Sequence, residues 1–94
     1  MSTRTENKYK VLTTLKNTEL CIEDIEMYSN MGRLSIIPVL TALHHWGEVE
    51  IVGEETNQLT KRKRKLYTTT EKGKRKLQYL KEKYEFTWKP RAVL

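Results

Sequence analysis

The sequence predicts a mostly helical α+β fold in which three helices are followed by a two-stranded hairpin and a fourth helix. Two observations carry this prediction. Apolar residues recur every three to four positions in four segments, which is the spacing of a helix with one buried face. Between the third and fourth segments, over residues 48–69, the period changes to two, the spacing of a strand. The 94 residues fit a single domain, 1–94.

The first two helices are expected near the N-terminus. Residues 1–6 are expected to form a flexible arm and residues 5–16 the first helix, whose buried stripe comprises Val11, Leu12 and Leu15. Residues 19–21 are long enough only for a bridging strand. A second helix is expected over residues 22–29. The turn that follows ends at Gly32, which is able to take a positive φ.

The third helix, expected over residues 35–46, has clear signals at both ends. Ser35 is a good N-cap, and Pro38 falls in the first turn, where its missing amide proton costs nothing. Gly47 follows the last helical residue, where a left-handed C-terminal cap belongs. The inner face of this helix is expected to carry Ile36, Leu40 and Leu43.

The hairpin and the last helix complete the predicted order. Over residues 48–69, Val49 and Ile51 are expected on the buried face of the first strand. The return strand begins with five consecutive cations, namely Lys61, Arg62, Lys63, Arg64 and Lys65. Thr70 caps a helix expected over residues 70–88, and residues 89–94 are expected to form a tail.

This order (helix, short bridge, helix, turn, helix, hairpin, helix) is that of a winged helix-turn-helix domain, with the hairpin as a two-stranded wing. The stretch LSIIPVLTALHHWGEVEIV resembles the recognition helix and first wing strand of MarR- and PadR-type regulators, in which leucines like Leu40 and Leu43 are followed by a glycine like Gly47. The segment RKLYTTTEKGKRKL is similar to their second wing strand and next helix, with the pattern R-K-Y-Y-x-L-T-x-x-G. The resemblance covers about residues 8–84. It implies a DNA-binding transcriptional regulator, of a kind that includes small stand-alone proteins of archaea and their viruses.

The charge is divided unequally along the chain. Residues 1–60 carry a net charge of −4 and residues 61–94 a net charge of +10, which together give the overall +6. The basic end is suited to a polyanion, and nucleic acid is a commoner partner of a small basic domain than an anionic membrane. No run of 18 apolar residues and no secretory leader occurs in the sequence, so an intracellular protein without a membrane span is expected.

Double-stranded DNA is therefore the expected partner, through two groups of residues. The five wing cations, 61–65, can lie along the phosphate backbone or reach into the minor groove. In the resembling families the early positions of the recognition helix enter the major groove. The resemblance thus implies hydrogen bonds from Arg33, Ser35 and Thr41 and thymine-methyl contacts from Ile37 and Pro38.

Other interpretations of the same residues stay open at this point. The lysine-rich strand could merely protect a sheet edge from aggregation, or act as a nuclear-import signal. The apolar surface around Ile37 and Pro38 could dock a protein, and the basic wing could bind RNA or single strands. The sequence shows no motif typical of an enzyme, and the adjacent His44 and His45 point about 100° apart on a helix, so neither a metal nor a cofactor is predicted.

A homodimer is also expected, because one helix cannot bury all the apolar residues near the C-terminus. We expect the interface to comprise Leu80, Tyr84, Phe86 and Trp88, and two copies would then reach half-sites about one DNA turn apart. The single cysteine, Cys21, is interpreted as a small buried residue, with a cross-chain disulfide as the alternative. The sequence does not identify a small-molecule effector.

Overall fold

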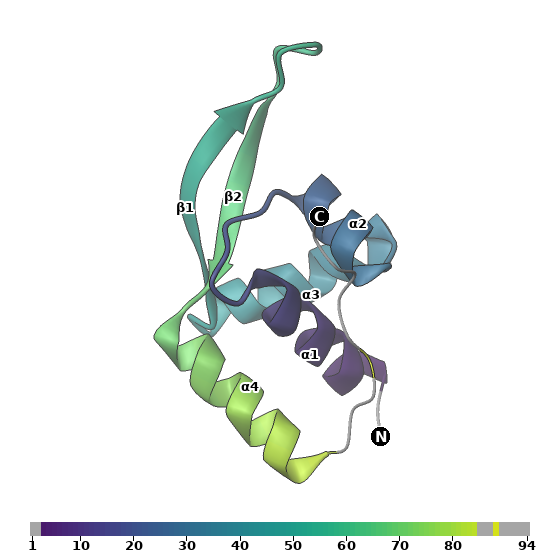
Figure 1. Ribbon diagram of the computed structural model, residues 1–94, viewed down its shortest axis with the longest axis vertical. Helices are drawn as coiled ribbons and strands as arrows, with labels where there is room; N and C mark the ends of the chain where they lie inside the picture. The colour runs from purple at the N-terminus through teal and green to yellow at the C-terminus, as the bar shows by residue number, and fades with distance from the viewer. Residues whose placement is uncertain (1–2, 85–87, 89–94) are drawn as a thin grey trace.

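The computed structural model describes residues 3–84 and residue 88. Its elements follow the predicted order, which confirms the α+β winged-helix fold class (Figure 1). The wing, β1 and β2, is an antiparallel pair that extends away from the helices (Figure 1). The expected bridging strand is a single pairing of Leu20 with Tyr67 of the wing. The bounds of the elements are α1 Thr3–Leu15, α2 Ile22–Ser29, α3 Arg33–His45, β1 Val49–Thr56, β2 Lys63–Thr69 and α4 Glu71–Lys83.

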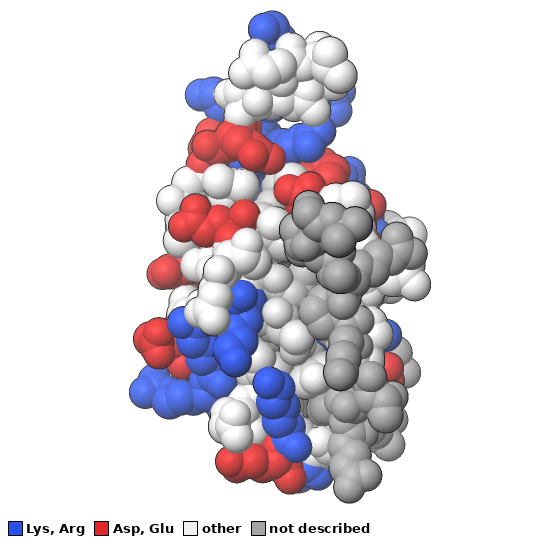
Figure 2. Space-filling model, viewed as in Figure 1, with Lys and Arg blue, Asp and Glu red and all other residues white. Residues whose placement is uncertain are grey.

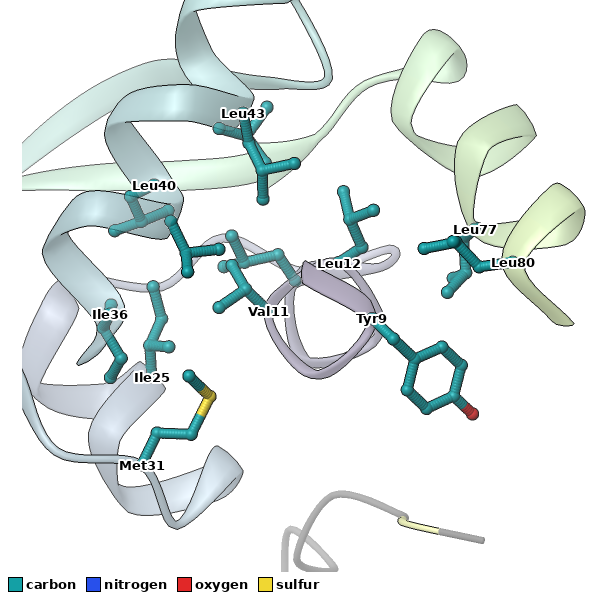
Figure 3. Packing of buried hydrophobic residues seen from close by; sticks show 13 residues of the cluster. Tyr9, Val11, Leu12, Ile25, Met31, Ile36, Leu40, Leu43, Leu77 and Leu80 are labelled. Carbon is teal, nitrogen blue, oxygen red and sulfur yellow. The ribbon is translucent and has the colours of Figure 1, made fainter. Parts of the chain in front are cut away.

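The core is built around α1, which lies between α3 and α4 (Figure 3). The predicted stripe of α1 is fully buried, and Tyr9 extends it toward α4 (Figure 3). From α3 the core receives the predicted Ile36, Leu40 and Leu43, and from α4 it receives Leu77 and Leu80. Each such side chain contributes about 1.5–3 kcal/mol by leaving water. The packing therefore fixes α3 and α4 on opposite sides of α1.

One helix boundary and one turn near the N-terminus differ from the prediction. Residues 3–6 belong to α1, so the expected flexible arm does not extend past residue 2. An ion pair between Glu6 and Lys10 (3.4 Å), one turn apart, supports this first turn, and no glycine or proline interrupts it. After α2, the residue with positive φ is Asn30 (φ 58°), whereas Gly32 is extended (φ −75°).

The third helix starts two residues earlier than predicted. Gly32, not Ser35, is its N-cap, and Pro38 consequently lies in the interior of α3 rather than in its first turn. The proline is tolerated because its side chain is exposed and only one backbone hydrogen bond is lost. At the other end the prediction is confirmed, since Gly47 adopts φ 73° and Glu48 N–H donates to the carbonyl of Leu43 (2.8 Å).

The last helix is shorter than predicted. It ends at Lys83, and Tyr84 is extended (φ −126°, ψ 147°), so Trp88 does not continue the helical series. Trp88 instead packs edge-on against Tyr9 of α1, with ring centroids 6.2 Å apart.

The root of the wing is fastened by a small set of polar contacts. The Thr70 hydroxyl donates to the carbonyl of Gly47 (2.7 Å) and accepts from the amide of Gly73 (3.1 Å), which confirms the predicted cap of α4. Gly73 packs directly on the carbonyl of Glu48, with no room for a Cβ. The end of α3, the start of β1 and the start of α4 are thus held together at one point.

Candidate nucleic-acid interface

The exposed surface of α3 has two sides that meet different neighbours. Arg33, Ile37 and Thr41 lie toward the wing, and Ile37 is 42% exposed there. Pro38 lies on the other side, in a shallow groove that α3 forms with the start of α1. Ser35 is exposed, as expected of a residue that contacts DNA. The five predicted residues of α3 therefore do not form one cluster, because helical geometry separates neighbouring positions by about 100°.

Arg33 is bound to two acids of α2. Its guanidinium donates to Glu26 (Nε to Oε1, 3.0 Å) and to Glu23 (Nη2 to Oε1, 2.8 Å). Burial alone would raise the pKa of Glu23, but hydrogen bonds from its own amide and from the Cys21 thiol, together with two nearby arginines, lower it. These pairs also explain the early start of α3, since they hold its first residue against α2.

The second arginine beside Glu23 comes from the wing. The Arg64 Nε lies 3.9 Å from Glu23 Oε2, and its side chain is only partly exposed, whereas Lys63 and Lys65 are exposed. The cations therefore alternate in direction over residues 63–65, as the side chains of a strand do. One arginine points toward α2, and the lysines on either side of it remain available to a ligand.

The first two wing cations lie in the turn, outside the strand in which they were predicted. Lys61 has φ 60°, its amide donates to the Asn57 carbonyl (2.7 Å), and Arg62 follows it before β2 begins. The Asn57 side chain accepts from the amides of Leu59 (2.8 Å) and Thr60 (3.2 Å), which closes the tip. Leu59 is 95% exposed at this tip.

The sheet register decides which wing cations are opposed by acids. Glu54 pairs with Lys65 across the ladder and Glu55 pairs with Arg64, while Lys63 faces Thr56. Opposite charges directly across a ladder attract each other. The uncompensated cations are therefore those of the tip, namely Lys61, Arg62 and Lys63.

The register is also interrupted in β1. Ile51 pairs with Tyr67 and Gly53 with Leu66, which leaves Val52 as an extra residue in a bulge. Ile51, predicted to be buried, is 40% exposed, because the ribbon leaves the core after Val49.

A continuous groove separates α3 from the wing. It consists of two adjoining cavities of about 300 and 240 Å³, and both are lined by Ile22, Ile37, Lys65 and Tyr67. Arg33 and Lys63 border the first cavity, and Thr41 and His44 border the second. The groove thus has an apolar floor and cationic or polar rims contributed by both α3 and β2.

Four side chains predicted to contact a second copy have different surroundings. Leu80 is 2% exposed and belongs to the core of its own chain, so the structure does not present it to a partner. Tyr84 and Trp88 are partly buried against that core, and Phe86 lies outside the described residues.

Cys21 is 1% exposed, in agreement with its interpretation as a small buried residue, and burial raises the pKa of its thiol.

Cys21 also has two acidic neighbours. One potential ligand atom each from Cys21, Asp24 and Glu55 lies within 4.8 Å of the other two. A metal would require the thiolate, which the raised pKa disfavours, and Glu55 lies on the exposed wing. We therefore assign no metal to this cluster.

Sequence reasoning missed one residue on the outermost face of α3, namely Leu34. Once the helix begins at Arg33, the positions 34, 38, 41 and 45 follow one another at helical spacing, and Leu34 is 90% exposed. Leu34 and His45 therefore join Pro38 and Thr41 on this face. The predicted start at Ser35 placed Leu34 outside the helix, which concealed the pattern.

Within the described part of the chain, no helix has the length and apolar character needed to cross a membrane.

These features define the class of the protein. A helix-turn-helix with an exposed third helix, followed by a cationic two-stranded ribbon, is a winged-helix domain, and its fold is similar to that of solved PadR and MarR family regulators. The comparisons with solved structures carry that assignment, because no protein-family model matches the chain and no curated protein sequence matches it.

Three solved structures illustrate the likeness. A PadR family transcription regulator from Clostridium difficile has a TM-score of 0.69 at 15% identity, over 82% of this chain and 84% of that one. Bacillus subtilis PadR in complex with operator DNA has a TM-score of 0.68 at 26% identity, over 93% of this chain and 51% of that one. A MarR family transcription regulator has a TM-score of 0.59 at 16% identity, over 88% and 51%. The chain thus spans about half the length of the last two.

Proposed function

We propose that this chain binds double-stranded DNA and regulates transcription, with the exposed face of α3 in the major groove and the wing against the backbone or in the minor groove. The observation that carries the proposal is the groove between α3 and β2, because it sets a helix face and a row of cations side by side. Bacillus subtilis PadR, 26% identical over most of this chain, is described in complex with operator DNA. The proposed function involves no catalysis, and it requires access to DNA and hence an intracellular location.

The wing tip supplies the electrostatic part of the proposed interface. Duplex DNA carries one negative charge per about 1.7 Å of its axis, and each phosphate neutralised by the protein releases condensed counterions. Lys61, Arg62 and Lys63 have no acid opposite them in the ladder and are exposed. We infer that these three residues contact phosphates, whereas Arg64 chiefly fixes the wing against α2.

The outer face of α3 supplies the base contacts in this proposal. The Thr41 hydroxyl donates to the carbonyl of Ile37 (2.9 Å), so its lone pairs remain free to accept from a base edge. Leu34 and Pro38 offer apolar surface suited to thymine methyl groups. Ser35 lies on the flank nearer α1 and is better placed for a phosphate than for a base.

We also propose that two copies act together, as the sequence predicts. Because Leu80 is committed to its own core, the interface would use the surface beside Tyr84 and Trp88. Sedimentation at increasing concentration tests this part, and a monomer at the highest concentration refutes it. A dimer would place two α3 helices on half-sites about one helical turn apart.

The DNA-binding proposal is tested by the salt dependence of duplex binding, measured by fluorescence anisotropy. Replacing Lys61, Arg62 and Lys63 by glutamine should weaken binding and reduce the log–log salt slope by about 2.7, at 0.9 per phosphate contact. A matched pair of single variants, Lys63→Gln and Lys16→Gln, each removes one exposed charge. Only the first should lower the affinity.

Two results would overturn the proposal. Equal losses in the two single variants would indicate a general effect of net charge rather than a wing contact. Tighter binding of RNA or single strands than of duplex, at matched salt, would favour the alternative nucleic-acid partner. Ile37 and Pro38 line different grooves, so the protein-docking alternative cannot use them as one apolar patch.

A further inference from the structure

A second cationic surface lies on α4, at the opposite end of the molecule from the wing tip. Figure 2 shows Lys and Arg side chains gathered over this helix. Between Glu71 and Lys83 the sequence places six Lys or Arg residues and only two acids. The proposed DNA contacts of α3 and the wing use none of them.

Four residues of α4 form a stripe along one flank of the helix, and all but the partly buried Lys76 are exposed. Lys72, Lys76, Tyr79 and Lys83 are spaced at i, i+4, i+7 and i+11, so they follow one another along a single line. At 1.5 Å per residue the stripe is about 16 Å long. One strand of a duplex presents a phosphate about every 3.4 Å of axis, so the stripe spans roughly five phosphates.

The acids of α4 are occupied elsewhere. Glu71 pairs with Lys74 (3.2 Å), and Glu82 accepts a hydrogen bond from Gln78 (3.1 Å). Both acids lie roughly a quarter-turn away from the stripe, at 100° per residue. Among residues 3–84 and 88, neither Lys72 nor Lys76 has a carboxylate within ion-pair distance.

The middle of the stripe concentrates positive charge around an aromatic ring. The ammonium groups of Lys76 and Lys83 lie 5.4 and 5.5 Å from the centroid of Tyr79, and Lys83 also donates to its phenol oxygen (3.0 Å). The hydrogen bond and charge of Lys83, with the charge of Lys76, lower the pKa of Tyr79. The local potential is therefore positive, as an anion-binding surface requires.

The stripe belongs to a helix that α1 separates from α3, so we expect it to contact a different duplex segment from α3 and the wing. In Figure 3, α1 lies between α3, which carries Leu40 and Leu43, and α4, which carries Leu77 and Leu80. Helix α4 thus lies on the far side of α1 from α3, except for its first turn, where the Lys72 side chain lies near Gly47 at the end of α3. The stripe also exposes no aliphatic side chain that could enter a lipid bilayer, and Tyr79 is only 47% exposed.

We propose that the α4 stripe binds the phosphate backbone of a second duplex segment, so that one molecule bridges two stretches of DNA. This inference rests on the proposed DNA-binding function and extends it. A single contact of this kind would be sequence-independent and sensitive to salt, because it involves phosphates alone. Its occupant is a nucleic acid, chosen over a membrane for the reasons given above.

A capture assay tests the bridging. A duplex is fixed on beads, protein is added, and the retention of a second, fluorescent duplex is measured. Lys72→Gln with Lys76→Gln removes two charges of the stripe, and the matched control, Lys74→Gln with Lys81→Gln, removes two charges from the other flank of the same helix. Lysine and glutamine have similar helix propensities, so both variants should fold.

The stripe variant should capture at least tenfold less of the second duplex than the parent does, while its affinity for a single duplex stays within about threefold of the parent's. The control should capture as much as the parent within about twofold. Equal losses in both variants, or undiminished capture by the stripe variant, overturn the proposal. In particular, a dimer that bridges through two wings would leave capture unchanged in the stripe variant.

Two further outcomes separate this proposal from the proposed function. A parent protein that binds one duplex but captures no second duplex refutes the bridging alone, and one that binds no duplex refutes both. Vesicles of anionic phospholipid serve as the competing ligand. If the stripe substitutions abolish vesicle binding and leave duplex capture intact, the surface belongs to a membrane and the proposal fails.

Discussion

Gly73→Ala tests the packing at the root of the wing, because local propensity and tertiary contacts predict opposite results. Gly73 lies in the first turn of α4, where alanine is favoured over glycine by up to about 1 kcal/mol. An added Cβ, however, would collide with the backbone carbonyl of Glu48 and lie 2.7 Å from the Cγ2 of Thr69. Neither obstacle is the flexible end of a long side chain, so the helix itself would have to move.

The magnitude follows from the contacts that such a shift would break. The amide of Thr70 donates to the same Glu48 carbonyl (3.1 Å), and losing this buried bond costs about 1–3 kcal/mol. Overpacking adds about 1–3 kcal/mol. After the gain in propensity, we expect a net loss of about 3 kcal/mol in the free energy of unfolding. For a domain of this size that corresponds to a fall in Tm of roughly 12–24 °C.

Chemical denaturation followed by circular dichroism measures this change, with Gly53→Ala as the control. Gly53 has no heavy atom within 4 Å of its would-be Cβ, so that variant should stay within about 1 kcal/mol of the parent. If Gly73→Ala is as stable as the parent, or more stable, the close approach of α4 to the start of β1 is wrong.

Three more predictions follow from individual contacts. Glu23→Gln should strengthen duplex binding about threefold, because Arg33 would lose one of its two carboxylate partners and keep only Glu26 in competition with a phosphate; weaker binding in the same anisotropy assay would contradict this. The thiol of Cys21 should react slowly with a disulfide reagent at neutral pH and rapidly after denaturation, because burial raises its pKa and keeps it protonated; equal rates would place it at the surface. Tyr79 should ionise below the ordinary range of a phenol, since the hydrogen bond and charge of Lys83 favour the phenolate, and Lys83→Met should raise its pKa again; an ultraviolet titration that is identical in both proteins would refute the contact.

Elements whose signals are local could be predicted from the sequence. The bounds of α2, the cap by Thr70 and the stop at Gly47 are all as predicted, because each depends on residues within one turn of helix. All five cations lie in the predicted hairpin, and their contact with DNA stays a prediction. Their different surroundings were not predicted, because Arg64 is distinguished from Lys63 only by an acid some forty positions earlier in the chain.

The errors have long-range causes. The start of α3 depends on the ion pairs of Arg33 with α2, which a helix-capping pattern does not reveal. The apolar periodicity that extended the predicted α4 to Trp88 does not reveal that this side chain packs against Tyr9, nearly the whole length of the chain away. Leu80 was assigned to a partner surface because the periodicity of α4 identifies a buried face without identifying what covers it.

The extra residue in β1 has a consequence for how the wing is aimed. Below Val52 the ribbon is anchored to the helices through Thr70 and the Leu20 pairing; above it, the strands carry the lysine-rich tip into solvent. A bulge bends the strand and increases its right-handed twist at one place. The bulge therefore sets the direction in which the tip points, and it does so independently of the core. Deleting one residue there would leave the helices as they are and rotate the cations away from the groove beside α3. The direction of the wing can therefore change without any change in the hydrophobic core.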